Sequence, residues 1–417
     1  MSATPLSPRA RYAVLAAAFG ALLFDGLELG LMPLVSLSVS KSLLGAAYTP
    51  TLGGDWFARF TAALMAGAAI GGIVLGALGD RIGRTRAMGV SVLFYSLFAG
   101  LGAWVTTQEQ MLLLRFVVGL GVGGVWPNAV ALVAESWPDK SRPVVAGLMG
   151  AAINSGILFL SQLAQLHPVT PDSWRWLFYI AGAPALLGVV VLLFLPESPT
   201  WLASRGRAAG TKPPAPLREL FRPPLLRVTL VGILLGSIPL VGAWAASKWM
   251  IPWADEIGRA VRSDYKAVTQ GWWAAGAILG SLIGAQIAAL LGRRLSYFLI
   301  SVGSFALTWA MFQMTAPLQA SFLPVVFAQG LVATLFFGWL PLYLPELFPT
   351  AVRATGSGIS YNVGRFATAV GVLAAGALFT SLGGSYARVG AAASFIYGFG
   401  ILVIWLAPET NRQSLAK

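Results

Sequence analysis

Charged residues are scarce in this chain. Only 10% of its 417 residues are charged, whereas a soluble globular domain carries about 25%. Hydrophobic residues make up 57%, so polar side chains are too few to cover a water-exposed surface. Apolar stretches of about 20 residues recur along the whole length, and a helix of that length crosses a hydrocarbon core of about 30 Å. We therefore expect an all-α integral membrane protein.

Cysteine is absent, and histidine occurs once. The chain therefore has neither a disulfide framework nor a thiolate metal site. His167 lies beside Pro168 in a predicted loop without other metal-binding side chains, so we interpret it as a surface residue. No combination of nucleophile, base and orienting group can be traced. We expect no metal, no cofactor and no enzymatic reaction.

The alternating pattern of a membrane β-barrel is also missing, because the stretch from Leu186 to Leu195 contains no polar side chain. Gly119-x-Gly121-x-x-Gly124 fits a dinucleotide-binding fingerprint. However, it lies inside an apolar span with no preceding strand, which favours close helix packing instead. No Walker sequence occurs, which argues against ATP-driven transport.

Positive charge exceeds negative charge, and the net charge is +13. In a soluble protein this would suggest a nucleic-acid partner. Here 18 of the 28 Lys and Arg residues fall in or beside one set of connecting segments, seven fall on the opposite side and three lie inside spans. That asymmetry predicts a multi-pass protein of the inner or plasma membrane, with both termini in the cytoplasm. Its expected surroundings are the lipid bilayer and no nucleic acid.

Hydropathy predicts twelve spans. The first follows two arginines but runs past the length of a signal peptide, so we interpret it as a membrane span. Residues 203–224 are charged and contain five prolines, which predicts a cytoplasmic linker between six-helix halves at 1–202 and 225–417. The predicted spans are 12–34, 57–78, 87–105, 110–133, 144–166, 174–195, 225–250, 268–291, 295–314, 322–343, 356–382 and 387–407.

The two halves repeat each other in sequence. Three landmarks recur in order, at offsets of 209 (83 to 292), 211 (135 to 346) and 212 (196 to 408) residues. They are Gly-Arg after the second and eighth spans, Glu and Arg seven apart after the fourth and tenth, and Pro-Glu-Ser or Pro-Glu-Thr after the sixth and twelfth. A duplicated six-helix unit explains all three, and such repeats form a central site between the halves.

The same landmarks resemble the major facilitator superfamily over essentially the whole chain. Four sequences carry the resemblance: Gly76-x-Leu78-x-Asp80-Arg81-x-Gly83-Arg84, Arg115-x-x-x-Gly119-x-Gly121, Glu135-x6-Arg142 and Pro196-Glu197-Ser198-Pro199. In addition, Phe24-Asp25-Gly26-Leu27-Glu28 is similar to the acidic motif of organic-anion proton symporters, with Glu where Asp is usual. The resemblance implies a secondary transporter that works by alternating access.

The chain departs from the superfamily pattern at two positions. Ala289 stands where the second-half copy would match Asp80, and Thr200 replaces the usual basic residue after Pro-Glu-Ser-Pro. Only the first half therefore keeps the complete charge cluster.

Asp25 and Glu28 lie three residues apart on one helical face inside an apolar span. An ionised carboxylate there costs several kcal/mol unless it is paired or hydrated, so both are candidates for function. Helical rise places both acids and Arg115 at similar depths, about 20–24 Å from the cytoplasmic face. We expect one acid to pair with Arg115 and couple transport to protons. The alternative is a static ion pair that only fixes helix packing.

Arg365 is expected close to the midplane, where a permanently charged guanidinium can bind a carboxylate through two hydrogen bonds. The alternative is pairing to a helix carbonyl or to Glu346. Lys248 is expected near the outer end of its span, reaching water. Asn154, Gln329, Tyr361 and Asn362 offer hydrogen bonds to a substrate and Trp244 an apolar wall, or else they bridge helices.

Four further tryptophans and a set of cytoplasmic charges complete the candidate residues. Trp249, Trp253, Trp272 and Trp273 are expected in an outer interfacial belt. The charges are expected either to gate the transporter through salt bridges or to be solvated loop residues. They are Asp80, Arg81, Arg84, Glu135, Arg142, Glu197, Glu346, Arg353 and Glu409.

The sequence thus favours a monomeric proton symporter for a small organic carboxylate. A sugar porter is the nearest alternative, since Glu135-x6-Arg142 and Pro196-Glu197-Ser198-Pro199 also fit that branch. A membrane receptor or scaffold with the same fold is less favoured, because it would not need four charged side chains in hydrocarbon. An intramembrane enzyme is the least supported.

Overall fold

The computed structural model describes residues 6–137, 142–205, 217–349 and 352–410. Within these ranges the regular elements are helices, and twelve helical segments are long and apolar enough to cross a membrane. The predicted fold class is therefore confirmed. Of the predicted linker, residues 206–216 lie outside the described part.

The first half consists of six spans and one short helix. Its sixth span is divided into α6 and α7 at Pro184, because proline cannot continue the helical hydrogen bonding. The helices are α1 (Pro8–Leu44), α2 (Pro50–Ile82), α3 (Arg84–Leu101), α4 (Gln108–Ser136), α5 (Arg142–Leu166), α6 (Arg175–Gly182), α7 (Ala185–Phe194) and the short α8 (Pro199–Arg205).

The second half repeats this order. In this half it is the first span that is broken. Its helix α9 contains Pro239 and passes into a π turn at Gly242–Ala246 and a 3-10 turn at Ser247–Trp249 before α10 begins. The helices are α9 (Leu225–Val241), α10 (Met250–Gly258), α11 (Tyr265–Leu291), α12 (Arg293–Gln313), α13 (Phe322–Glu346), α14 (Arg353–Ser381) and α15 (Tyr386–Val403).

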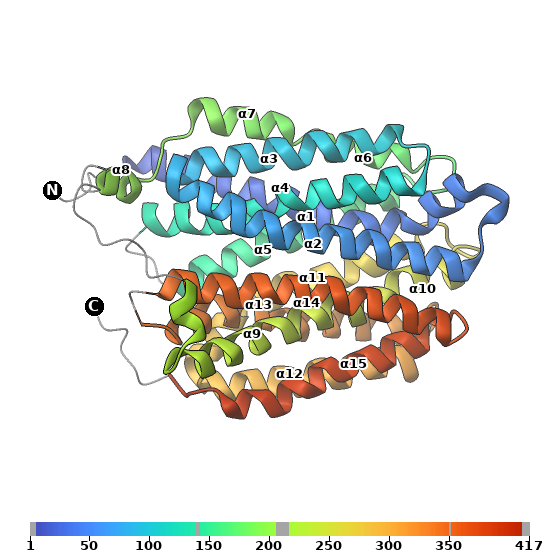
Figure 1. Cartoon of the computed structure of the whole chain (residues 1–417). Helices are drawn as coiled ribbons and strands as arrows, with labels where there is room; N and C mark the ends of the chain where they lie inside the picture. Colours follow the sequence, from blue (N-terminus) through green and yellow to red (C-terminus); the bar gives the residue numbers. More distant parts are fainter. Residues whose placement is uncertain (1–5, 138–141, 206–216, 350–351, 411–417) are drawn as a thin grey trace.

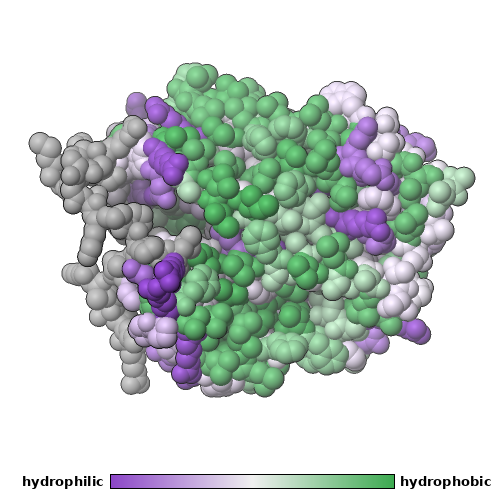
Figure 2. All heavy atoms as spheres, viewed as in Figure 1, coloured by the Kyte–Doolittle hydropathy of each residue, from purple (hydrophilic) through white to green (hydrophobic). Residues whose placement is uncertain are grey.

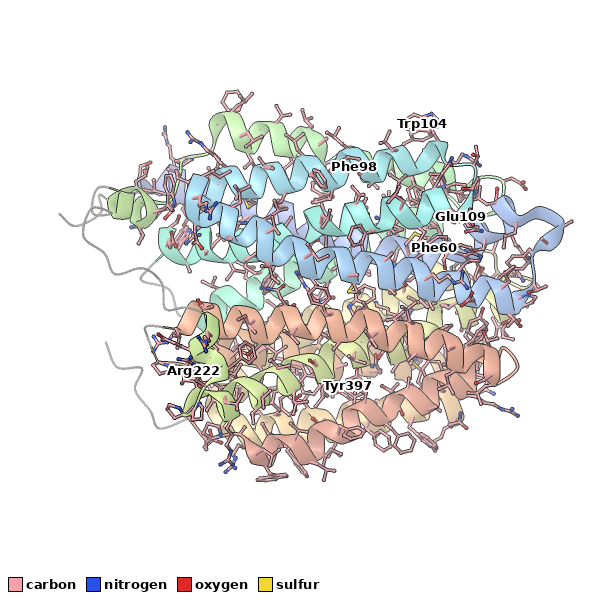
Figure 3. The ribbon with its side chains drawn as sticks, viewed as in Figure 1. Phe60, Phe98, Trp104, Glu109, Arg222 and Tyr397 are labelled. Carbon is pink, nitrogen blue, oxygen red and sulfur yellow. The ribbon has the colours of Figure 1, made fainter. Side chains whose placement is uncertain are left out.

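The two halves lie side by side, and the described part of the chain begins and ends at one end of the bundle (Figure 1), which we call the terminal end. The opposite end is called the far end. The halves meet where α5 runs along α11 and where α2 runs along α14. Figure 3 shows Arg222 at the terminal end and Trp104 and Glu109 at the far end.

The surface of the bundle is apolar between its two ends. Figure 2 shows a broad hydrophobic band with hydrophilic residues gathered at either end. Large apolar side chains such as Leu186, Leu193 and Phe194 are exposed on the surface of the bundle. Such a surface is stable in lipid and would aggregate in water.

The first helix is longer than predicted. The expected span ends at residue 34, whereas α1 continues to Leu44. Ser36, Ser38 and Ser40 lie beyond the expected end, and all three are buried inside the bundle. Polar residues that pack between helices extend a membrane helix beyond its hydrophobic window.

Close packing of α1 on α5 requires glycine at two positions. A Cβ on Gly26 would lie 1.8 Å from the Ile153 carbonyl oxygen, and one on Gly156 would lie 1.7 Å from the Leu23 carbonyl oxygen. Neither position tolerates a side chain, so the two backbones touch directly. This contact fixes the stretch of α1 that carries Asp25 and Glu28.

Candidate functional site

A cavity lies between the two halves of the bundle. Its volume is about 100 Å³, several times what one water molecule needs. Asp25, Lys248 and Arg365 are the charged residues in its lining, and Asn154 and Thr334 add polar groups. The aromatic side chains in the lining are Trp126, Trp244, Trp273, Phe337 and Tyr361.

Asp25 and Arg365 bring opposite charges into this cavity from opposite halves. The Asp25 side chain is only 2% exposed, and Arg365 is the cation that acts on it most strongly. The Arg365 guanidinium donates to the carbonyl oxygen of Ala68 at 3.0 Å and lies 5.2 Å from the Tyr361 ring centre. Arg365 therefore binds a helix carbonyl, which was one of the alternatives to a substrate carboxylate, and its side chain still lines the cavity.

Glu28, one turn further along α1, has a different partner. Arg115 Nη2 donates to Glu28 Oε2 at 2.8 Å, and both side chains are excluded from solvent. Neither residue is part of the cavity lining. Of the two acids that could pair with Arg115, the structure therefore selects Glu28 and leaves Asp25 facing the cavity.

The interpretation of Lys248 as a lysine that reaches water is wrong. Lys248 is 1% exposed, lines the cavity, and its Nζ lies 3.3 Å from the centre of the Trp273 ring. The span continues to Gly258, eight residues past its predicted end at 250, so Lys248 lies deeper than expected. In addition, the π turn changes which side of the span faces the interior.

Two of the four tryptophans assigned to an interfacial belt are also interior residues. Trp249 is fully buried and packs on Phe57 and Phe379, with ring centres 5.1 Å apart in each case. Trp273 is buried in the cavity wall. Trp272, in contrast, is 43% exposed, as a belt residue should be. Hydropathy alone could not distinguish these positions.

The predicted hydrogen-bonding residues divide into two groups. Asn154, Tyr361 and Trp244 line the cavity, whereas Gln329 and Asn362 are not among its lining residues. Asn154 also donates to Ser281 Oγ at 2.9 Å and so connects the halves. The Asn362 amide donates to the carbonyl oxygen of Gly358 within its own helix.

Gln329 holds other polar side chains in place. It accepts a hydrogen bond from Trp273 Nε1 at 2.7 Å and donates to Ser247 Oγ at 2.6 Å and to Thr308 Oγ1 at 3.1 Å. All four residues are buried. Gln329 thereby fixes the Trp273 ring from behind the cavity wall.

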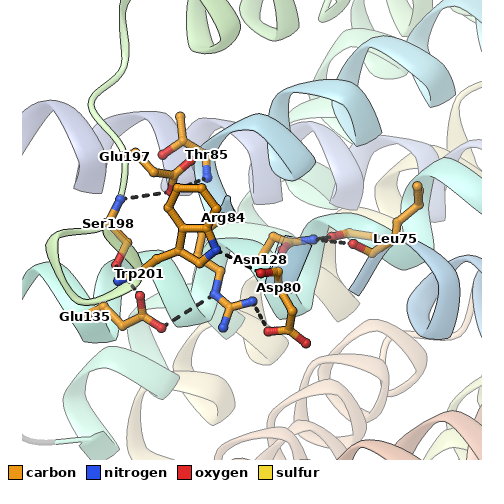
Figure 4. Close-up of polar contacts among 10 residues, drawn as sticks. Leu75, Asp80, Arg84, Thr85, Asn128, Glu135, Glu197, Ser198 and Trp201 are labelled. Atoms are coloured by element: carbon orange, nitrogen blue, oxygen red, sulfur yellow. Dashed lines mark hydrogen bonds and ion pairs between the residues drawn. The ribbon is translucent and has the colours of Figure 1, made fainter. Parts of the chain in front are cut away.

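The terminal end carries a charged cluster in the first half (Figure 4). Arg84 pairs with Asp80 and lies 3.5 Å from Glu135, which accepts a hydrogen bond from Ser198. Glu197 accepts the backbone N–H of Thr85 at 3.1 Å. These contacts tie the ends of α2, α3 and α4 to the segment after α7.

The second half repeats this cluster. Arg293 donates to both carboxylate oxygens of Glu346, at 3.0 and 2.8 Å, and Thr410 donates to the same carboxylate. Glu409 accepts the backbone N–H of Arg293 at 3.1 Å and of Arg294 at 3.0 Å. The sequence repeat is therefore also a repeat of hydrogen-bond geometry. Glu346, which the sequence suggested as a partner for Arg365, is paired with Arg293 instead.

Arg81 and Arg353 make no described contact with these two clusters. Arg81 is exposed, and Arg353 Nε donates to the carbonyl oxygen of Phe348 at 3.4 Å. Arg142 begins α5, but its side chain lies outside the described part of the chain. Among the described contacts at this end, each ion pair joins residues of one half.

At the far end, by contrast, residues from the two halves are in contact. Lys266 Nζ donates to Ser38 Oγ of α1 at 3.1 Å and lies 3.2 Å from Asp255. Phe57 of α2 packs on Trp249, as described above. Polar and aromatic contacts therefore join the two halves at the far end.

In the described ranges, no group of three or more His, Cys, Asp or Glu side chains is placed to hold a metal ion.

Two protein families match the chain. Residues 14–258 match the Major Facilitator Superfamily, and residues 218–417 match the family described as "Sugar (and other) transporter". Together the two matches cover almost the whole chain.

Curated relatives and solved structures agree with this. The cis,cis-muconate transport protein of Acinetobacter baylyi is 32% identical over 378 residues, which cover 88% of this chain and 87% of that protein. A probable 4-methylmuconolactone transporter of Cupriavidus pinatubonensis is 30% identical over 82% of this chain and 79% of that protein. The crystal structure of a D-xylose–proton symporter covers 97% of this chain and 99% of its own, with a TM-score of 0.72 and 17% identity.

Proposed function

The chain belongs to the major facilitator superfamily of membrane transporters, and from this premise we propose that it carries a small organic anion together with a proton. One observation carries the proposal: the cavity between the halves contains Asp25 from the first half and Arg365 from the second. A titratable acid beside a permanent cation can link a proton to an anion in one chamber.

The proton-coupling residues are Asp25, Glu28 and Arg115. While Asp25 is ionised, it competes with a substrate carboxylate for the Arg365 guanidinium. When Asp25 takes up a proton, that competition ends and Arg365 is free to bind the substrate carboxylate. The Glu28–Arg115 pair holds α1 in place beside Asp25 and is the second proton-linked site of this group.

The proposed substrate is a carboxylate bound mainly by Arg365. Asn154, Tyr361 and Trp244 line the same cavity, and Gln329 and Asn362 support it from the second half. The names of two relatives, which refer to muconate and 4-methylmuconolactone, favour organic acids. The match of residues 218–417 to a sugar-transporter family is the observation that favours a sugar as the alternative. A cavity with two cations and one acid suits an anion better than a neutral sugar.

Uptake into proteoliposomes tests this function. We expect an imposed inward proton gradient to accumulate labelled muconate or benzoate, and to leave labelled xylose and glucose at background. Accumulation of the sugars without the carboxylates would replace the proposal by the sugar alternative. If the wild type takes up carboxylates at the same rate with and without the proton gradient, transport is not coupled to protons.

We further propose that the two halves, 1–202 and 225–417, rock as units about the cavity, connected by the linker at 203–224. The excess of Lys and Arg at the terminal end favours a cytoplasmic location for both termini. In that orientation the contacts between the halves at the far end lie on the outer side. Epitope tags at either terminus should then be protected from antibody in intact cells and accessible after permeabilisation.

In this scheme the charged residues of the terminal end gate the cytoplasmic mouth. The intra-half pairs of Arg84 and Arg293 keep each half rigid, while exposed charges such as Arg81 meet the opposite half when the mouth closes. The proposed gating residues are Asp80, Arg81, Arg84, Glu135, Arg142, Glu197, Glu346, Arg353 and Glu409. We propose that the monomer is the working unit.

A further inference from the structure

Lys248 is a second cation in the cavity, and among the described residues no acid is paired with it. Its ammonium group has no hydrogen-bond partner among the described residues and is buried to 99%. Asp25, the acid in the cavity lining, has Arg365 as its electrostatic partner, and no ion pair of Lys248 is found in the described part of the chain. A buried ammonium without an anion is strongly unfavourable, so its presence points to a ligand that supplies the missing charge.

The surroundings of Lys248 hold the ammonium group in one place. Its Nζ lies 3.3 Å from the Trp273 ring centre and 5.9 Å from that of Trp244, which gives partial compensation through cation–π attraction. Trp273 is fixed by Gln329, and Gln329 in turn binds Ser247, the neighbour of Lys248 in the broken span. The cation is thus preorganised, which lowers the entropy lost when an anion binds.

The charges of the cavity set the charge of its ligand. With Asp25 protonated, Arg365 and Lys248 leave two positive charges, while Glu28 and Arg115 cancel each other behind the wall. A ligand with two carboxylates neutralises the loaded cavity, whereas a monocarboxylate leaves one buried positive charge. A neutral loaded cavity is the state that passes most easily between the two faces of the membrane.

We propose that Lys248 is a second carboxylate-binding residue and that the transporter therefore selects dicarboxylates over monocarboxylates of the same shape. One carboxylate binds Arg365 and the other binds Lys248 across the aromatic walls of the cavity. This inference rests on the proposed function, because it assumes that organic anions enter the cavity.

Pairs of ligands that differ only in the second carboxylate test its contribution to binding. trans,trans-Muconate and sorbate share one carbon skeleton, and sorbate carries a methyl group where muconate has its second carboxylate. Terephthalate and 4-methylbenzoate form an aromatic pair of the same kind. Binding to the purified full-length protein is measured by quenching of tryptophan fluorescence, since Trp244 and Trp273 line the cavity. We expect each dicarboxylate to bind at least about tenfold more tightly than its partner.

Lys248→Met removes the charge and keeps most of the length of the unbranched side chain. We expect it to lower muconate affinity to the level of sorbate and to leave sorbate affinity at least as high as in the wild type, which also shows that the variant is folded. Arg259→Met, which removes an exposed cation at the end of α10, is the control and should alter neither ligand. Arg365→Gln should weaken both ligands.

The outcomes separate the two proposals. If dicarboxylates and monocarboxylates bind equally, or if Lys248→Met weakens sorbate as much as muconate, the dicarboxylate inference is wrong while the organic-anion function stands. If none of the four acids binds to the wild type or is carried in counterflow, the proposed function itself fails.

Discussion

Glu28 and Arg115 form a solvent-excluded ion pair, with 2.8 Å between Oε2 and Nη2. Asp25 lies one helical turn away, yet it lines the cavity and has Arg365 as its main cation. The two acids of α1 therefore have different environments although they share one face of one helix. Different environments imply different responses to mutation.

Asp25→Asn should separate exchange from accumulation. Because asparagine cannot release a proton, we expect substrate counterflow to persist while accumulation driven by a proton gradient is lost. In the proposed mechanism substrate binding needs protonated Asp25, so the carboxylate affinity of the wild type should fall as pH rises, whereas the affinity of Asp25→Asn should depend on pH much less. Binding titrations across pH 5–9 and uptake in proteoliposomes check both effects. An unchanged pH dependence in Asp25→Asn would assign coupling to another group.

Removing one member of the Glu28–Arg115 pair should destabilise the protein. Glu28→Gln or Arg115→Gln leaves a buried charge without its partner, which costs about 3–5 kcal/mol. The double substitution removes both charges, so it should be more stable than either single variant. Thermal unfolding of the purified proteins in one detergent compares the three. Additive losses in the double variant would mean that the pair does not interact energetically.

Charged residues that lie inside the spans could be identified from the sequence, because an ionised side chain is unusual in an apolar stretch. Asp25, Glu28, Arg115 and Arg365 were all found in this way. The partner of each could not be assigned, since helix packing decides whether Glu28 or Asp25 meets Arg115. The sequence does not show how far each helix is rotated about its own axis relative to its neighbours.

Lys248 shows a different limit. Its depth was counted along a regular helix, whereas the span contains a π turn and a 3-10 turn after Pro239. Pro239 and Gly242 were the available signal for this break. Likewise, Gln329 has the polarity of a substrate-binding residue, but its orientation behind Trp273 follows only from tertiary packing.

Gln329 should act on the cavity through Trp273. Trp273→Phe keeps an aromatic face for Lys248 but loses the indole N–H that Gln329 accepts, and Gln329→Met loses the same bond from the other side. We expect each variant to weaken muconate binding by about three- to tenfold, as one hydrogen bond is worth about 0.5–1.5 kcal/mol. The double variant should be no weaker than the single ones. Fluorescence titration measures all three, and independent, additive losses would contradict this coupling.

The two charged clusters at the terminal end should differ in strength. Arg293 donates twice to Glu346 and is mostly buried, whereas Arg84 pairs with Asp80, whose side chain is 68% exposed. Breaking the buried pair by Arg293→Gln should cost about 3 kcal/mol. Arg84→Gln should cost about 1 kcal/mol. Apparent Tm values give the order, and an equal or reversed order would show that exposure does not control these pairs.

The absence of cysteine makes the far end directly testable by crosslinking. A Cβ placed on Gly376 of α14 would lie 2.6 Å from the Cβ of Ala58 on α2. A shift of about 1 Å brings this pair to the Cβ separation of a disulfide, about 3.8 Å. These two helices belong to opposite halves, so a bond between them holds the far end closed.

We therefore expect oxidised Ala58→Cys/Gly376→Cys to lose both uptake and counterflow, and a reducing agent to restore them, because alternating access requires α2 and α14 to separate at the far end. Each single cysteine variant should remain active under oxidation. A cysteine pair at Gly100 and Gly182, which face each other within the first half, serves as a crosslinked control that should not block transport. Full activity of the crosslinked far-end variant would mean that the halves do not separate there, and the rocking mechanism would have to be abandoned.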